Sequence, residues 1–286
     1  MGRTSNKDKE AQVLKEMKTQ ENAVSASANE NLQQQATDIF NENSSLIETV
    51  QLSSRGKIPN TPSEITIRAV KRKDKKKLLM SQTGATLLNL LQACVVSPTN
   101  FNVFNLPPFE TEYLLYRLKV LSYGPMYTFK DACPYCNHIN EVESDLNDID
   151  IIPVPDDFSL VFNIGPLPVS GSVIHCKILN DGELEMIRKQ FKNQNGDFST
   201  LDIDILWEYR IIGIDNNMDL APIEITQHLD ELSDYDSEYL GAYYNEYMGN
   251  YGIQDDLIYD CDQCNRKVES KMPSIYTFFR PSFKFN

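Results

Sequence analysis

Two short stretches decide how this chain folds: Cys133-Pro-Tyr-Cys136-Asn137 and Cys261-Asp-Gln-Cys264-Asn265. In each, two residues separate the cysteines, and a Val-Glu-Ser triplet follows, at residues 142–144 and 268–270. Two intervening residues let the backbone turn so that both sulfurs reach one ion, at about 2.3 Å for zinc. Each stretch is therefore predicted to form a zinc knuckle, which consists of a strand, a turn that carries the cysteines, and a returning strand.

The two knuckles together supply four thiolates. We predict that Cys133, Cys136, Cys261 and Cys264 bind one structural Zn2+ in a tetrahedral site with no position open for a substrate. The 124 residues between Cys136 and Cys261 make this a split zinc ribbon, in which the ion closes a very long loop. The two halves of the ribbon are expected near residues 126–145 and 257–272.

Two alternatives to this ligand set stay open at this point. Cys133 and Cys136 alone match the spacing of a dithiol redox pair, but no helix pattern begins there and such chemistry does not need the second pair. His138 is a candidate to replace one cysteine, although its place two residues after Cys136 favours a turn residue. Cys94 and Cys176 lie in apolar patterns and are predicted to be core residues.

Charge is distributed unevenly along the chain. The net charge is -14, but the first 80 residues carry +4 and the remaining 206 carry -18. An acidic body repels phosphate backbones, which argues against nucleic acid as a partner. The basic run Lys71–Lys77 is interrupted by Asp74 and has no aromatic neighbours, so we interpret it as a solvated hairpin tip.

No apolar run approaches the roughly 20 residues that span a bilayer, and Met1–Glu10 has no hydrophobic leader. We therefore expect a protein that has no membrane contact and is kept in a cytosol. In that compartment, paired cysteines bind metal more often than they form structural disulfides.

Composition divides the chain into two parts. Residues 1–63 are rich in Gln, Asn, Ser and Ala and contain a single aromatic residue, Phe40, so we predict a disordered polar N-terminal tail. Residues 64–286 are predicted to form a globular domain that contains the zinc ribbon and a helical insertion at 180–252. The expected fold class is α+β: a mostly helical body with antiparallel β-hairpins and a split four-cysteine zinc ribbon.

Hydrophobic periodicity locates the individual elements. Helices are predicted at 86–96, 109–121, 183–192, 201–214 and 234–251, and strands at 64–70, 126–130, 139–145, 158–164 and 172–179. Tyrosine recurs every fourth residue from Tyr235 to Tyr251, which makes a stripe along a helix. This stripe either packs on the domain with its hydroxyls at the rim or binds a partner. The aromatic-rich residues 274–285 are predicted to form a docking strand.

One region has a family resemblance. Residues 105–119 read Asn-Leu-Pro-Pro-Phe-Glu-Thr-Glu-Tyr-Leu-Leu-Tyr-Arg-Leu-Lys, and Ser122-Tyr-Gly-Pro125 leads from there to the first cysteine pair. This order of features resembles the baseplate hub and hub-assembly protein family of T4-type bacteriophages with contractile tails, over about residues 65–272. The resemblance implies a structural protein of the virion tail baseplate hub, or a factor that assembles the hub in the host cytoplasm. Implied partners are other baseplate, hub, tail-tube or tape-measure proteins.

The sequence contains none of the motifs GxSxG, GxxxxGK[ST], HExxH and GxGxxG, and it has only three histidines. We therefore expect a non-enzymatic protein–protein interaction module that a structural zinc ion stabilises. The alternative is a zinc-ribbon regulator that binds nucleic acid through Lys71–Lys77.

Overall fold

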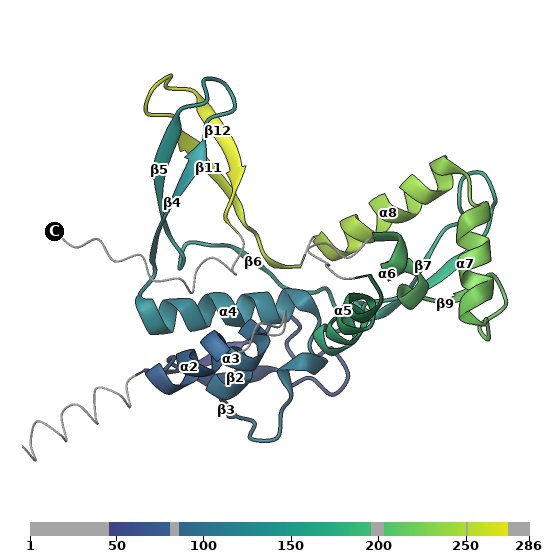
Figure 1. Ribbon diagram of the computed structural model, residues 1–286, viewed down its shortest axis with the longest axis horizontal. Helices are drawn as coiled ribbons and strands as arrows, with labels where there is room; N and C mark the ends of the chain where they lie inside the picture. Colours follow the sequence, from purple (N-terminus) through teal and green to yellow (C-terminus); the bar gives the residue numbers. More distant parts are fainter. Residues whose placement is uncertain (1–45, 81–85, 196–202, 250, 274–286) are drawn as a thin grey trace, which may run out of the picture. The chain divides into compact units, whose positions relative to one another are not determined.

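The computed structural model describes residues 46–80, 86–195, 203–249 and 251–273 (Figure 1). Its elements lie in one compact unit, Glu48–Asn286, apart from Ile47 at the start of the first strand. The docking strand predicted at 274–285 and most of the predicted tail fall outside the described residues. Within them, no helix has the length and hydropathy to cross a bilayer.

The first core forms around a three-stranded sheet. Strands β1 (Ile47–Gln51), β2 (Glu64–Arg68) and β3 (Val95–Ser97) lie side by side in that order, and β2 and β3 pair antiparallel. The alternation that predicted β2 places Ile65 and Ile67 in the core, fully buried. The helices α2 (Arg72–Met80), α3 (Thr86–Cys94) and α4 (Pro108–Tyr123) belong to the same part of the fold. Leucines of α3 and α4 complete the core, for example Leu91 and Leu118.

Helix α4 confirms the prediction made from its sequence. Pro108 occupies a first-turn position, where its missing N–H costs nothing, and Gly124 ends the helix with φ 81°. The Glu110 carboxylate in the first turn of α4 has a structural role. Glu110 is fully buried and accepts hydrogen bonds from the backbone N–H groups of Ser53 and Ser54, at 3.1 and 2.6 Å.

This contact corrects the predicted domain boundary. Composition assigned residues 47–63 to a disordered tail, yet the segment contains β1, buries Val50, Leu52 and Ile58, and contacts Glu110 at Ser53 and Ser54. Its apolar residues are few, and Val50 and Leu52 are buried in the core that β1 and β2 share, although β2 lies later in the chain. The polar composition of residues 47–63 therefore led to a prediction of disorder for a segment that contains the strand β1.

The second core forms around another three-stranded sheet. Strands β7 (Val161–Ile164), β8 (Ile174–Lys177) and β9 (Ile211–Ile214) pair antiparallel in that order. The pair predicted at 158–164 and 172–179 is confirmed in β7 and β8. Four helices follow along this half of the chain: α5 (Asp181–Asn195), α6 (Ile203–Arg210), α7 (Pro222–Glu231) and α8 (Asp234–Gly249). Trp207 of α6 and Tyr244 of α8 pack edge to face in the core, with ring centroids 5.3 Å apart.

Two hairpins and one short pair of strands complete the topology. β4 (Met126–Ala132) pairs with β5 (Ile139–Asp145), and β11 (Asp256–Asp260) pairs with β12 (Lys267–Lys271). β6 (Ile151–Ile152) pairs with β10 (Gly252–Ile253), so the chain leaves toward the second core and returns from it through two adjacent strands.

The predicted fold class is wrong in one respect. The described residues contain seven helices and twelve strands, and 37% of them are helical against 26% in strands, so the fold is α+β but its body is not mostly helical. Residues 201–214, predicted as one helix, change to strand at Ile211 because Ile211–Ile214 pairs with β8. Conversely, the predicted hairpin tip at Lys71–Lys77 lies at the start of α2.

Removal of the Glu110 carboxylate tests its role in holding the β1 segment. Glu110→Ala leaves the N–H groups of Ser53 and Ser54 buried without acceptors, so we expect the free energy of unfolding to fall by about 2–4 kcal/mol. Urea unfolding measures this loss. Glu143→Ala removes an exposed carboxylate on β5 and should change stability by less than about 0.5 kcal/mol. Equal unfolding midpoints for the two variants would contradict the assignment.

Asp181, at the start of α5, gives the fold a pH dependence. Its side chain is 8% exposed and accepts a hydrogen bond from the Thr111 hydroxyl of α4, and burial raises the pKa of Asp181 to about 6. A folded-state pKa above the unfolded value means that the native protein binds more protons between about pH 4 and 6. The contribution of Asp181 to stability therefore decreases as pH rises through that window.

The substitution Asp181→Asn removes this titration. The unfolding free energy of the wild type minus that of the variant should decrease by roughly 2–3 kcal/mol from pH 4 to pH 7. Denaturant titrations at several pH values measure the difference. The matched control Asp219→Asn changes an exposed acid and should give a difference independent of pH. A flat profile for Asp181→Asn would refute the interpretation.

Candidate metal centre

The first knuckle is built by the turn between β4 and β5. Cys133 follows β4 directly, and its backbone N–H donates to the carbonyl of His138 at 2.8 Å. The N–H of Asn137 donates back to the carbonyl of Cys133 at 2.9 Å. Asn137 has φ 58°, a left-handed conformation that asparagine tolerates better than most residues. The turn therefore places the Cys133 and Cys136 side chains on the same side.

The second knuckle, between β11 and β12, has the same construction. The N–H of Cys261 donates to the carbonyl of Arg266, and the N–H of Asn265 donates to the carbonyl of Cys261, both at 2.9 Å. Asn265 has φ 54°. The similarity of the two sequence stretches thus reflects one local structure that occurs twice.

The structure brings all four predicted cysteines together. Their sulfurs lie within 4.8 Å of one another, although the two hairpins come from distant parts of the chain (Figure 1). The Sγ atoms of Cys133 and Cys264 are 3.7 Å apart, as are those of Cys136 and Cys261. Four thiolates at about 2.3 Å from one tetrahedral ion have sulfur–sulfur separations of about 3.8 Å, whereas a disulfide needs about 2.05 Å. The cluster therefore fits a metal ion and not two disulfides.

Burial of the cluster also fits a metal site with no open position. Cys133 and Cys261 are at most 1% exposed, and Cys136 and Cys264 are half-buried. Val268 packs against the cysteines, and Tyr259 contacts them from β11.

Electrostatics at the site favour a cation. The backbone N–H of Cys264 lowers the pKa of Cys261 to about 6, although desolvation acts in the opposite direction. For Cys136, the N–H of His138 lowers the pKa, but desolvation and the other three cysteines raise it to about 12. A bound dication stabilises all four thiolates at once, because metal-ligating thiols lose their protons.

Polar contacts between the hairpins keep them in register beside the cluster. The Tyr259 hydroxyl donates to Asp131 Oδ2 at 2.9 Å, and the N–H of Asp262 donates to Asn140 Oδ1 at 3.0 Å. Asn140 is almost completely buried. Sequence reasoning missed these contacts, because the partners lie 128 and 122 residues apart and no local pattern links them.

Of the described residues, His138, His175 and the two other cysteines are not part of the cluster. The His138 imidazole is not among the clustered ligands, and its carbonyl closes the first turn. Cys94 and Cys176 are buried in the first and second cores, as predicted. The ring nitrogens of His175 lie 2.6 Å from Asn163 Oδ1 and 2.7 Å from the carbonyl of Asp215, which gives this histidine a structural role.

Comparison with known proteins identifies the family to which the chain belongs. The family model described as T4 bacteriophage base plate protein matches residues 47–194, which is just over half of the chain. The chain belongs to this family. This baseplate protein is therefore a structural component of a bacteriophage, and its location is the virion tail baseplate, among other phage structural proteins. The match includes the first knuckle and ends before the second. No curated protein and no solved structure matches the chain.

Metal analysis tests the four-cysteine site. The purified baseplate protein should contain about one zinc ion per chain, and Cys133→Ser or Cys264→Ser should abolish it. Loss of the ion should lower the melting temperature by on the order of 10 °C, because the knuckles are then free to separate. Cys176→Ala, which alters a buried cysteine outside the cluster, should keep the metal. Full zinc content in Cys264→Ser would contradict the proposed ligand set.

Proposed function

We propose that this baseplate protein is a non-enzymatic component of the baseplate hub, or a factor that assembles the hub, and that a structural zinc ion gives it a rigid surface for protein contacts. The observation that carries the proposal is the four-sulfur cluster, which joins hairpins separated by 124 residues. A site whose four positions are all thiolates leaves none for substrate or water, so its zinc holds the structure together and does not take part in catalysis.

The double hairpin around the zinc site has the surface of a contact module. Four large apolar side chains on it are at least half exposed: Met126, Tyr135, Ile139 and Ile258. Two-stranded hairpins bury little on their own, and the metal makes this pair rigid. Exposed apolar side chains concentrated on one rigid element support a role in binding another protein.

The alternative, a regulator that binds nucleic acid, is less well supported. Exposed acids lie beside the thiol cluster on both hairpins, including Glu141, Asp260 and Asp262. Arg266 stacks over the Tyr135 ring, with 5.2 Å from its guanidinium carbon to the ring centroid. This contact occupies one of the few cations near the cluster, which is then less available to bind phosphate. Phosphate binding needs a basic surface, and this one carries both signs.

Co-expression with tail proteins of the same phage tests the proposal. The baseplate protein should co-elute in size exclusion with a hub, tail-tube or tape-measure protein, and mass spectrometry of intact virions distinguishes a retained subunit from an assembly factor. The variant Met126→Ser/Ile139→Ser/Ile258→Ser should lose co-elution while retaining one zinc. Met186→Ser/Met218→Ser, which changes exposed methionines elsewhere, should behave as wild type. A chain that stays alone with every tail protein would rule out the proposal, and a salt-dependent shift of DNA or RNA would favour the alternative.

A further inference from the structure

Helix α8 exposes one face to solvent. The face consists of residues spaced three or four apart: Tyr235, Glu238, Tyr239, Ala242, Tyr243 and Glu246. Tyr235 is 64% exposed, and Tyr239 and Tyr243 are 37% and 38% exposed. We call this surface the tyrosine face. Tyrosine rings at a surface supply apolar area with polar edges, and such rings are enriched in protein interfaces.

The rest of α8 is anchored, so the tyrosine face is held in place. Leu240 and Tyr244 are buried, and Tyr247 stacks on Phe162 with ring centroids 4.0 Å apart. Asp236 is fully buried and accepts hydrogen bonds from the N–H groups of Val169 and Ser170, at 2.8 and 2.9 Å. The stripe seen in the sequence thus splits: its last residues pack on the domain, and its first three point to solvent.

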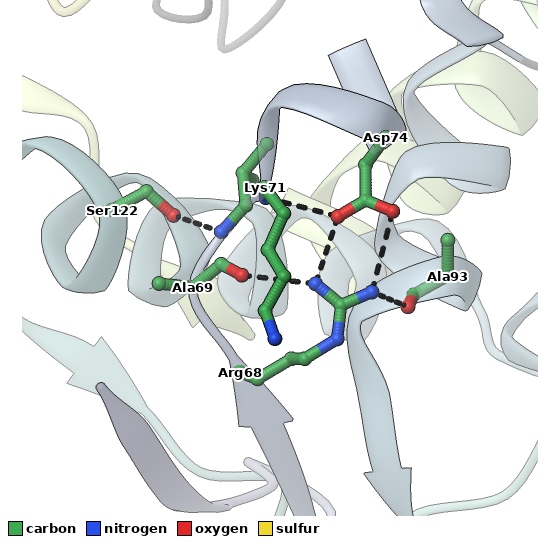
Figure 2. A network of polar contacts seen from close by, with 7 residues as sticks. Arg68, Ala69, Lys71, Asp74, Ala93 and Ser122 are labelled. Atoms are coloured by element: carbon green, nitrogen blue, oxygen red, sulfur yellow. Dashed lines mark hydrogen bonds and ion pairs between the residues drawn. The ribbon is translucent and has the colours of Figure 1, made fainter. Parts of the chain in front are cut away.

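A surface of opposite charge lies at the start of α2. Lys71, Arg72, Lys73 and Lys76 are exposed there, and we call them the basic face. Asp74, the one acid in this run, is buried and bound by the Arg68 guanidinium, whose two terminal nitrogens lie 2.8 and 3.3 Å from its carboxylate (Figure 2). The same carboxylate accepts from the Lys71 N–H. Since Asp74 faces inward, the exposed side chains at residues 71–73 and 76 are all basic.

The Figure 2 network also fixes where α2 begins. Arg68 donates further to the carbonyls of Ala69 and Ala93, and the N–H of Val70 donates to the Ser122 hydroxyl. No ion pair of the described residues engages the four basic side chains. The basic face is therefore a fixed cluster of exposed positive charge in a chain of net charge -14.

We propose that the tyrosine face of one copy of this protein docks on the basic face of a second copy. The two faces are complementary, because one offers aromatic rings with the Glu238 carboxylate and the other offers four cations. The chain already contains one contact of this kind, in which Lys75 of α2 lies over the Tyr123 ring with its amine 4.5 Å from the centroid. Cation–π contacts and opposite charges across an interface both favour association.

The geometry of this contact has a consequence for assembly. The two faces are different surfaces, so the contact is head-to-tail, and each copy keeps one face free for a third. Contacts of this type build closed rings or open chains and not simple twofold dimers. The inference does not depend on the hub assignment, because it concerns the purified chain alone.

Sedimentation velocity on the full chain measures the association. At about 50 mM salt the wild type should associate reversibly at micromolar concentration, and at about 500 mM salt it should dissociate, because exposed charges are screened. Arg72→Glu/Lys76→Glu and Glu238→Lys/Ala242→Lys should each weaken association at least about ten-fold, because like charges then meet.

An equimolar mixture of these two charge-reversed variants gives the sharpest result. Each variant repels itself, because its two faces carry charge of the same sign. In the mixture, the reversed basic face of one variant is complementary to the reversed tyrosine face of the other, and the native face of each is complementary to the native face of the other, so mixing should restore association. Lys130→Glu/Lys267→Glu, which reverses exposed charges on the hairpins, serves as the matched control and should associate as wild type. Zinc content and circular dichroism confirm that each variant is folded.

Two outcomes would overturn the proposal. One is a wild type that remains monomeric at about 100 µM in low salt; the other is a mixture that remains dissociated while the wild type associates. If the tyrosine face instead proved necessary only for co-elution with another tail protein, that protein would be its occupant and self-association would be excluded. Failure to co-elute with any tail protein would count against the hub role and leave this result unchanged.

Discussion

The clustering of four thiol groups from two distant hairpins is the contact that constrains the rest of the structure. It requires the 124 residues between Cys136 and Cys261 to leave one hairpin and return beside it. Four thiolates at such short separations would repel one another, so a bound cation would stabilise the cluster. The pairing of β6 with β10 closes the same stretch of chain a second time, between Ile151 and Ile253. The four-cysteine cluster and this strand pairing together tie the two ends of an insertion that contains the entire second core. Neither contact stabilises much without the other, because two-residue strands are weak and loop closure is costly.

Buried acids hold several other joints of this acidic protein. Glu110 accepts from the N–H groups at residues 53–54, Asp236 accepts from those at 169–170, and Asp74 binds Arg68. Each carboxylate offers two oxygens, so a single side chain can satisfy two backbone donors that would otherwise be buried without partners. These inward-facing acids also determine what remains outside. With Asp74 turned in, the exposed side chains at the start of α2 are basic, and with Asp236 anchored, Tyr235, Tyr239 and Tyr243 of α8 stay at the surface.

Local patterns predicted most elements well. The periodicity of residues 109–121 located α4, and the alternation in 64–70 and 172–179 located β2 and β8, because these segments bury one regular face. Predictions were wrong where pairing with a distant strand decided the conformation. Ile211–Ile214 looks like the end of a helix until β8 is beside it, and residues 47–51 look like a polar tail until β2 is beside them. The basic run at Lys71–Lys77 looks like a turn from its composition. Its helix depends on the contact between Arg68, which precedes α2, and Asp74 in the first turn of α2, and composition does not reveal that contact.

The sequence by itself determined the cysteine set and the local shape of each knuckle. Spacing of two residues between cysteines and an asparagine after the second are short-range constraints, and short-range backbone geometry follows from them. The sequence also predicted that the two knuckles share one site. Only the tertiary structure decided how their hairpins are held together, which residues cross-link them, and which tyrosines of α8 remain exposed. Those facts depend on contacts between segments more than a hundred residues apart or on the packing of a whole helix against its neighbours, and no local pattern contains that information.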